Sequence, residues 1–148
     1  MILFCDTSAL MKAYAQEEHS DRVIQWLKQA SSCFVSLITW AEMCAAFGLK
    51  QRTQQLTSTQ AAAGLERLRQ EWGNFGLIAI DSSLMMAAGE LALRFGLRAY
   101  DSVQLASAQR AHQHLGAAMT FCCFDKPLNT AASALAMTIL PQGDDGLV

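Results

Sequence analysis

The segment ILFCDTSALMKAY (residues 2–14) decides the fold class. Its first four residues form a continuous apolar run, which is typical of a strand buried on both faces of a parallel sheet. The polar triplet Asp6, Thr7 and Ser8 follows at once, and residues of these types cap helix N-termini. Residues 9–16 then carry helical apolar spacing. The segment therefore predicts a strand that passes directly into a helix.

The same strand–helix unit recurs along the chain. After the first strand we expect strands at residues 33–37, 77–80, 119–124 and 136–140, separated by segments of helical period. The helices are expected at 9–16, 20–30, 38–50, 57–72, 82–95, 100–114 and 126–134. This alternation predicts an α/β fold, a three-layer α/β/α sandwich around a central, mostly parallel five-stranded sheet. We assign residues 1–140 to a single domain and 141–148 to a polar C-terminal tail.

Composition excludes several classes of protein. With 148 residues, 52% of them hydrophobic, the chain is long and apolar enough to fold as one globular domain. A net charge of −2 argues against a nucleic-acid binder with a basic surface all round. No apolar run reaches the ~18 residues of a membrane span, and the N-terminus lacks the features of a signal peptide.

The five cysteines include no CxxC pair and the three histidines lack zinc-ligand spacing, so we expect free thiols in a reducing cytoplasm.

Carboxylates stand at the ends of three expected strands. Asp6, Asp81 and Asp125 each follow an apolar run, and ligands of parallel α/β sheets bind at the carboxyl ends of the strands. Glu42 lies on an otherwise apolar helix face with no Lys or Arg at i±3 or i±4, and Asp101 opens a helix. Each acid has a structural alternative: the aspartates as helix caps or turn residues, and Asp101 as part of a capping box with Gln104. For Asp81 we favour the cap.

Taken together, Asp6, Glu42, Asp101 and Asp125 point to a metal site. Several carboxylates cannot share one small site fully ionised without a cation, and hard oxygen ligands suit Mg²⁺ or Mn²⁺. Acidic clusters of this kind activate water for phosphodiester cleavage. The chain has no G-x-S-x-G elbow, P-loop or G-x-G-x-x-G motif, which disfavours nucleophilic-serine and nucleotide-cofactor chemistry.

Four motifs resemble one known family. They are DTSALMK (6–12), SLITWAE (36–42), GLRAYDSVQLASA (96–108) and FDKPLNTAA (124–132). Their order and spacing are similar to those of PIN-domain proteins, and more narrowly of the VapC toxins of prokaryotic toxin–antitoxin pairs. The resemblance covers nearly the whole chain.

The resemblance implies a Mg²⁺-dependent endoribonuclease, with Mn²⁺ as a possible substitute, that cleaves RNA by water attack on phosphorus. In this family's pattern Asp6 and Asp101 match the main metal-binding acids, Glu42 the acid that completes the shell and Asp125 the fourth. All four are thereby predicted as both metal ligands and catalytic residues. Ser8 matches a supporting hydroxyl.

The same resemblance implies a cognate antitoxin protein as partner, a homodimer and no membrane association. One position departs from the pattern: Cys123 stands where the family often has Ser or Thr, and a thiol is a poorer hydrogen-bond donor. We therefore expect Asp125 to be less well positioned and activity to survive in weakened form.

Three further residues receive roles under this interpretation. Arg98 and Lys126 are expected to flank the crevice and contact phosphates, and Trp40 to contact a partner chain. The alternative interpretation is a PIN-like module that binds RNA or protein without cleaving RNA. The repulsion among four retained acids argues against that alternative.

Overall fold

The computed structural model describes residues 1–116 and 118–142, so residues 143–148 of the predicted tail lie outside the described residues. The described strands are β1 (Ile2–Cys5), β2 (Ser32–Ser36), β3 (Gly76–Ile78), β4 (Thr120–Cys122) and β5 (Thr138–Leu140). The described helices are α1 (Thr7–Tyr14), α2 (Ser20–Gln29), α3 (Ile38–Arg52), α4 (Ser58–Glu71), α5 (Ser82–Phe95), α6 (Ala99–Leu115) and α7 (Lys126–Ala134), with a 3₁₀ turn at Trp72–Asn74. None of these helices is long and apolar enough to cross a membrane.

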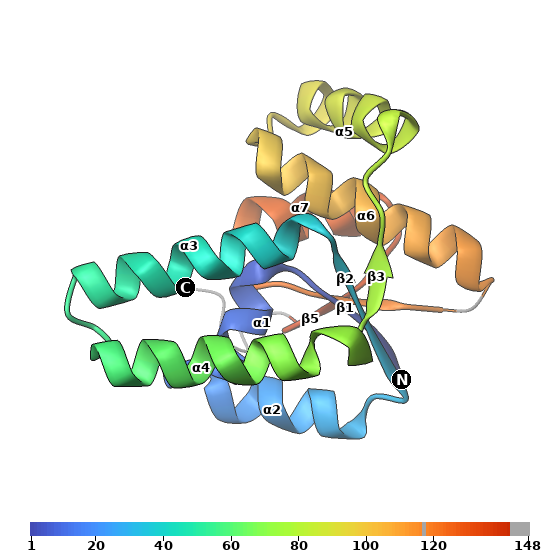
Figure 1. The fold of residues 1–148 in the computed structure, drawn as a ribbon. Helices are drawn as coiled ribbons and strands as arrows, with labels where there is room; N and C mark the ends of the chain where they lie inside the picture. Colours follow the sequence, from blue (N-terminus) through green and yellow to red (C-terminus); the bar gives the residue numbers. More distant parts are fainter. Residues whose placement is uncertain (117, 143–148) are drawn as a thin grey trace.

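The five described strands form one sheet in the order β3-β2-β1-β4-β5, and every neighbouring pair is parallel (Figure 1). β1 lies at the centre, where Phe4 pairs with Phe34 on one side and Phe121 on the other. The predicted α/β sandwich is thus confirmed, with a sheet that is wholly parallel. Because the strands are parallel, their carboxyl ends, and the acids that follow them, meet at one edge.

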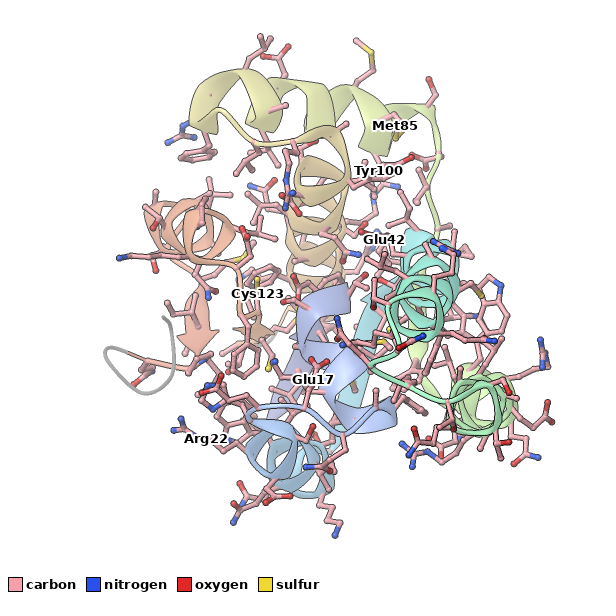
Figure 2. All side chains as sticks on the ribbon, turned by 90° about the vertical axis from the view of Figure 1, so that its left-hand side faces the viewer. Glu17, Arg22, Glu42, Met85, Tyr100 and Cys123 are labelled. Atoms are coloured by element: carbon pink, nitrogen blue, oxygen red, sulfur yellow. The ribbon has the colours of Figure 1, made fainter. Side chains whose placement is uncertain are left out.

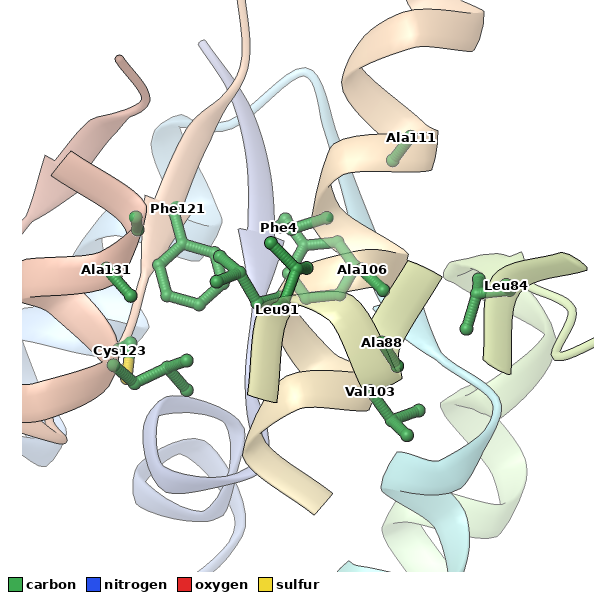
Figure 3. Close-up of a cluster of buried hydrophobic side chains, with 14 of the residues drawn as sticks. Phe4, Leu84, Ala88, Leu91, Val103, Ala106, Ala111, Phe121, Cys123 and Ala131 are labelled. Atoms are coloured by element: carbon green, nitrogen blue, oxygen red, sulfur yellow. The ribbon is translucent and has the colours of Figure 1, made fainter. Parts of the chain in front are cut away.

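Side chains of the central strands alternate between two cores, as the two-residue period of a strand requires. Phe4 and Phe121 stack with ring centroids 5.9 Å apart in the core covered by α5, α6 and α7 (Figure 3). Leu3, Cys5 and Cys122 face the opposite core, which α1, α3 and α4 cover. The helices therefore form two layers, one on each face of the sheet (Figure 1).

Boundaries differ from the expected ones mainly at the strands. β3 and β4 are shorter than predicted, and α1 begins at Thr7 because Asp6 caps it. Gly96 ends α5 in the left-handed conformation, with φ of 65°, as expected for a residue without a Cβ. Trp40 is half-buried and packs edge-on against Trp72, with centroids 5.4 Å apart, so a contact within the chain accounts for its burial.

Candidate active site

A cavity of about 510 Å³ opens at the carboxyl ends of the strands. The four acids predicted to work together, Asp6, Glu42, Asp101 and Asp125, all line it, and we call it the acid pocket. Its other walls are Thr7, Ser8, Ile38, Ala41, Ala45, Ala46, Arg98, Tyr100 and Gln104. Figure 2, turned so that the left-hand side of Figure 1 faces the viewer, shows that Glu42, Tyr100 and Cys123 come from different parts of the fold.

Asp6 is the most deeply buried of the four acids, with 4% of its surface exposed. Its Oδ1 caps α1 by accepting from the Ala9 amide at 3.0 Å and from Ser8 Oγ at 2.7 Å. Burial raises the pKa of Asp6 to about 6, against the lowering effect of hydrogen bonds from Cys123, Ser8 and Ala9, and the charge of Glu42 raises it further. Capping and site formation are therefore compatible roles of the same carboxyl group.

Cys123 links the first and last acids. Its thiol donates to Asp6 Oδ2 at 3.0 Å, and its sulfur accepts from the Asp125 amide at 3.2 Å. Burial, followed by the charge of Asp6, raises the pKa of Cys123 well above its usual value, so the group stays a thiol and keeps its proton for donation. Ser8 completes the link, because its hydroxyl also accepts from the Phe124 amide at 2.9 Å. The thiol thus makes the contacts of a hydroxyl.

Glu42 extends from α3 and is held by neutral donors from two other helices. Its Oε1 accepts from Thr7 Oγ1 of α1 at 3.0 Å and from Gln104 Nε2 of α6 at 2.7 Å. The other oxygen, Oε2, has no protein partner among the described residues. The arrangement fixes one oxygen of the carboxylate and leaves the other available in the pocket.

Arg98 lies across the two remaining acids. Its Nε donates to Asp101 Oδ2 at 3.0 Å, and its Nη2 lies 4.0 Å from Asp125 Oδ1. The hydrogen bond to Asp101 raises the pKa of Arg98. The side chain is 80% exposed. Asp125 meanwhile caps α7 through Oδ2, at 3.0 Å from the Leu128 amide.

Asp101 lies in the first turn of α6 but does not cap it, because the N-cap residue is Arg98. The capping-box alternative for Asp101 and Gln104 is therefore wrong.

Asp81 is a helix cap, as we favoured. Its Oδ1 accepts from the Leu84 amide at 2.8 Å, which lowers the pKa of Asp81, and the carboxylate pairs with Arg110 at 2.9 Å. Asp81 and Lys126 lie outside the lining of the acid pocket, and Lys126 is exposed at the start of α7.

The charge of the acid pocket is unbalanced, since four carboxyl groups face one guanidinium among its described lining residues. Among the described residues no three His, Cys, Asp or Glu side chains lie close enough together to hold a metal ion as they stand. The donor set nevertheless fits a divalent cation in kind, because carboxylate oxygens are the ligands that hard cations prefer. Binding would require the acids to move closer together and would offset their mutual repulsion.

Two residues of the site, Thr7 and Gln104, were not predicted from the sequence patterns. Both donate toward Glu42, and Gln104 also donates to Thr39. A polar residue one turn after Asp101, in the otherwise apolar run of α6, was the available signal. We attributed it to helix capping instead.

Comparisons with known proteins agree with this geometry. The PIN domain family model matches residues 3–121, a range that contains Asp6, Glu42 and Asp101 and ends before Asp125. Ribonuclease VapC46 of Mycobacterium tuberculosis is 29% identical over 93% of this chain and 95% of its own length.

Two solved structures share the fold. FitAcB from Neisseria gonorrhoeae has a TM-score of 0.62 and 22% identity, over 94% of this chain and 96% of that chain. VapC20 of Mycobacterium tuberculosis, a sarcin–ricin loop cleaving toxin, has a TM-score of 0.63 and 16% identity, over 87% of this chain and 94% of that chain. The matched range, the wholly parallel sheet and the acids at its carboxyl edge lead to one conclusion: the chain belongs to the PIN-domain family.

Proposed function

We propose that this protein is a metal-dependent endoribonuclease and the toxin of a toxin–antitoxin pair. The observation that carries the proposal is the convergence of Asp6, Glu42, Asp101 and Asp125 on one pocket with a single arginine among its lining residues. The likeness to Ribonuclease VapC46 over 93% of the chain supports RNA as the substrate. PIN-domain nucleases of this kind generally depend on a divalent metal.

In this proposal the four acids bind the cation and the reacting groups collect around it. Hydrogen bonds from Ser8, Ala9 and Cys123 hold Asp6, and hydrogen bonds from Thr7 and Gln104 hold Glu42. A bound divalent cation would supply the positive charge that eases ionisation of water and stabilises the leaving oxygen. Arg98, released from Asp101, would hold an RNA phosphate at the rim.

We favour Mg²⁺ as the cation, with Mn²⁺ as a substitute. The described lining of the pocket offers carboxylate, hydroxyl and amide oxygens and no imidazole, and this set suits hard cations better than zinc or copper. A hard cation held by these carboxylates would polarise a water molecule for attack on the phosphodiester.

The proposed partners follow from the same comparisons. Solved relatives include a toxin–antitoxin complex from Klebsiella pneumoniae and VapBC-1 from nontypeable Haemophilus influenzae, which supports a cognate antitoxin. A homodimer is supported by the exposed apolar side chains of α5, where Met85, Met86 and Leu93 are 52, 71 and 82% exposed. The five free cysteines support a reducing cytoplasm as the site of action.

A second candidate function is RNA or protein binding without cleavage. It is favoured by the separation of the acids, no three of which lie at metal-holding distance among the described residues. A binding module would retain its affinity for RNA when divalent cations are removed.

The test is cleavage of total prokaryotic RNA by the purified, antitoxin-free protein with Mg²⁺, with Mn²⁺ or with EDTA. An Asp6→Asn/Asp101→Asn double variant runs beside the wild type. We expect metal-dependent fragments from the wild type alone, and end-mapping of those fragments identifies the target. Intact RNA in every lane, together with EDTA-resistant RNA binding by both proteins, would overturn the nuclease and support the binding module.

A further inference from the structure

Gln104 is a buried amide at the wall of the acid pocket. It extends from α6, is 2% exposed, and its Nε2 lies within hydrogen-bond distance of three acceptors. These are Glu42 Oε1 at 2.7 Å, Thr39 Oγ1 at 2.9 Å and Thr7 Oγ1 at 3.2 Å. Because Glu42 and Thr39 belong to α3 and Thr7 to α1, one amide group ties three helices together beside the site.

Its neighbours fix the orientation of the amide. Rotating the amide by half a turn would place Oε1 against the Glu42 carboxylate, so that two acceptors met without a proton between them. In the observed orientation Oε1 is buried and has no hydrogen-bond partner among the described residues. An unsatisfied buried carbonyl lowers stability, so the position carries a cost that an apolar side chain of the same size would avoid.

The same orientation of the amide gives Glu42 a hydrogen-bond donor. The carboxylate has no basic side chain within hydrogen-bond distance among the described residues, and both of its donors, Thr7 and Gln104, approach the same oxygen. Oε1 is thereby occupied, whereas Oε2 accepts no hydrogen bond from the described residues, and Glu42 lines the cavity. A neutral donor fixes the carboxylate without cancelling its charge, which an arginine or a lysine in the same place would do.

We propose that Gln104 is a positioning residue for Glu42: its amide holds Oε1 so that Oε2 is presented to the cation of the acid pocket. The inference rests on the proposed function, since it assigns a role toward the metal. Partners of metal ligands that fix their orientation typically account for 10- to 100-fold in metal affinity or activity. Gln104 has that relation to Glu42.

Another residue of α6 offers a matched control. Ser107 is fully buried; its hydroxyl donates to Val103 O at 2.8 Å and lies 2.9 Å from Ser36 Oγ, without touching any of the four acids. Gln104→Met and Ser107→Ala each remove buried hydrogen bonds from α6. Only the first removes a donor from Glu42.

The experiment is a calorimetric titration of the metal-free protein with Mn²⁺, paired with thermal melting in EDTA. We expect the Mn²⁺ Kd of Gln104→Met to rise by about 10-fold or more, whereas that of Ser107→Ala stays within about twofold of wild type. Gln104→Leu is measured in parallel as a second apolar replacement. Steady-state cleavage is then expected to recover in part when Mn²⁺ is raised well above the new Kd.

The outcomes separate the two proposals. Unchanged Mn²⁺ affinity in folded Gln104→Met or Gln104→Leu, or an equal loss in Ser107→Ala, would overturn the positioning role alone. Loss of the cooperative melt in both Gln104 variants would also overturn it, because the residue would then hold the fold and not the carboxylate. Absence of Mn²⁺ binding by the wild type would overturn the proposed function together with the inference.

Discussion

Two cavities of similar size differ in how their charges are balanced. The acid pocket of about 510 Å³ gathers four carboxyl groups around Arg98. The other cavity, of about 560 Å³, lies between α2, α4 and β2 and contains Tyr14, Arg67 and Glu71; we call it the Tyr14 pocket. There Tyr14 Oη donates to Glu71 Oε2 at 2.5 Å, and the Arg67 guanidinium lies 4.6 Å above the Tyr14 ring and 3.8 Å from Glu71.

The volume of a cavity therefore does not by itself identify the candidate active site of this molecule. In the Tyr14 pocket the one carboxylate already has a hydroxyl and a guanidinium beside it, so an added cation would find little uncompensated charge. In the acid pocket burial raises the pKa of Asp6, and nearby Glu42 adds to that effect. A divalent cation would relieve both effects on the pKa of Asp6, which favours the acid pocket as the candidate active site.

The largest expected effect comes from Asp6→Asn. Asparagine keeps the cap of α1 and the shape of the side chain but removes a charge from the acid pocket. We expect RNA cleavage to fall by about 100-fold or more, since several kcal/mol of charge stabilisation depend on the bound cation. Glu71→Gln in the Tyr14 pocket is the matched control and should cleave at the wild-type rate. Equal losses of RNA cleavage in the two variants would show that the two pockets do not differ in function.

A second test uses the pH dependence of stability in EDTA. The pKa of Asp6 rises from 3.8 when unfolded to about 6 when folded, so ionising it costs the folded state about 3 kcal/mol. Below about pH 3 the group is protonated in both states, and stability is lost as pH rises from about 4 to about 6, where only the unfolded state ionises. Urea unfolding should therefore show wild type losing about 3 kcal/mol relative to Asp6→Asn between pH 3 and pH 7. A constant difference across this range would contradict the burial of the charge.

Tyr14→Phe tests the Tyr14 pocket as a structural feature. Burial, followed by the hydrogen bond to Glu71, raises the pKa of Tyr14, so the hydroxyl stays protonated and donates. Removing it should lower the free energy of unfolding by about 1 kcal/mol and leave cleavage unchanged. Chemical denaturation and a cleavage assay on the same sample check both parts. A cleavage defect without loss of stability would assign a functional role to this cavity.

Arg98→Ala is expected to affect RNA binding more than the chemical step. The guanidinium is 80% exposed beside Asp101 and Asp125, a position from which it reaches a phosphate. We expect KM for RNA to rise several-fold with little change in kcat, and the slope of log affinity against log salt to fall by about 1. Lys126→Ala, outside the pocket lining, should change KM less. The opposite ranking would move the phosphate contact to Lys126.

Cys123→Ser should have the smallest effect. The thiol already donates to Asp6 at 3.0 Å and accepts from the Asp125 amide, so a hydroxyl makes the same contacts with a stronger donor. Cleavage should stay within about threefold of wild type, equal or higher. Cys123→Ala, which removes the donor, should cleave more slowly than Cys123→Ser. An inactive serine variant would show that the site depends on the sulfur itself.

Sequence patterns predicted the fold well because the decisive features are local. Continuous apolar runs such as residues 2–5 mark buried parallel strands, and Asp81 and Gly96 mark the two ends of α5. Strand ends were less accurate: predicted strand 119–124 is Thr120–Cys122 in the structure, because pairing with the neighbouring strands determines where β4 ends.

The grouping of the four acids with Ser8 and Arg98 in one pocket was also predictable: Asp6 and Asp125 follow parallel strands whose ends meet, and the family motifs carried the other four residues. Gln104 was not predictable as a partner of Glu42, because the two residues are 62 positions apart and meet only when α3 and α6 pack. Cys123 was expected to position Asp125 less well than a serine or threonine would. Its burial and raised pKa, which keep its proton in place for Asp6, depend on the tertiary structure.

The most direct test of the central claim is to locate a bound Mn²⁺ by paramagnetic broadening of backbone amide signals. Substoichiometric Mn²⁺ added to labelled, antitoxin-free protein should broaden the amides of Ser8, Ala9 and Asp125 first. Those of Lys28, Asn74 and Phe75 around the Tyr14 pocket should remain sharp. Broadening centred on the Tyr14 pocket, or no selective broadening at all, would contradict the claim that uncompensated acid charge makes the metal site.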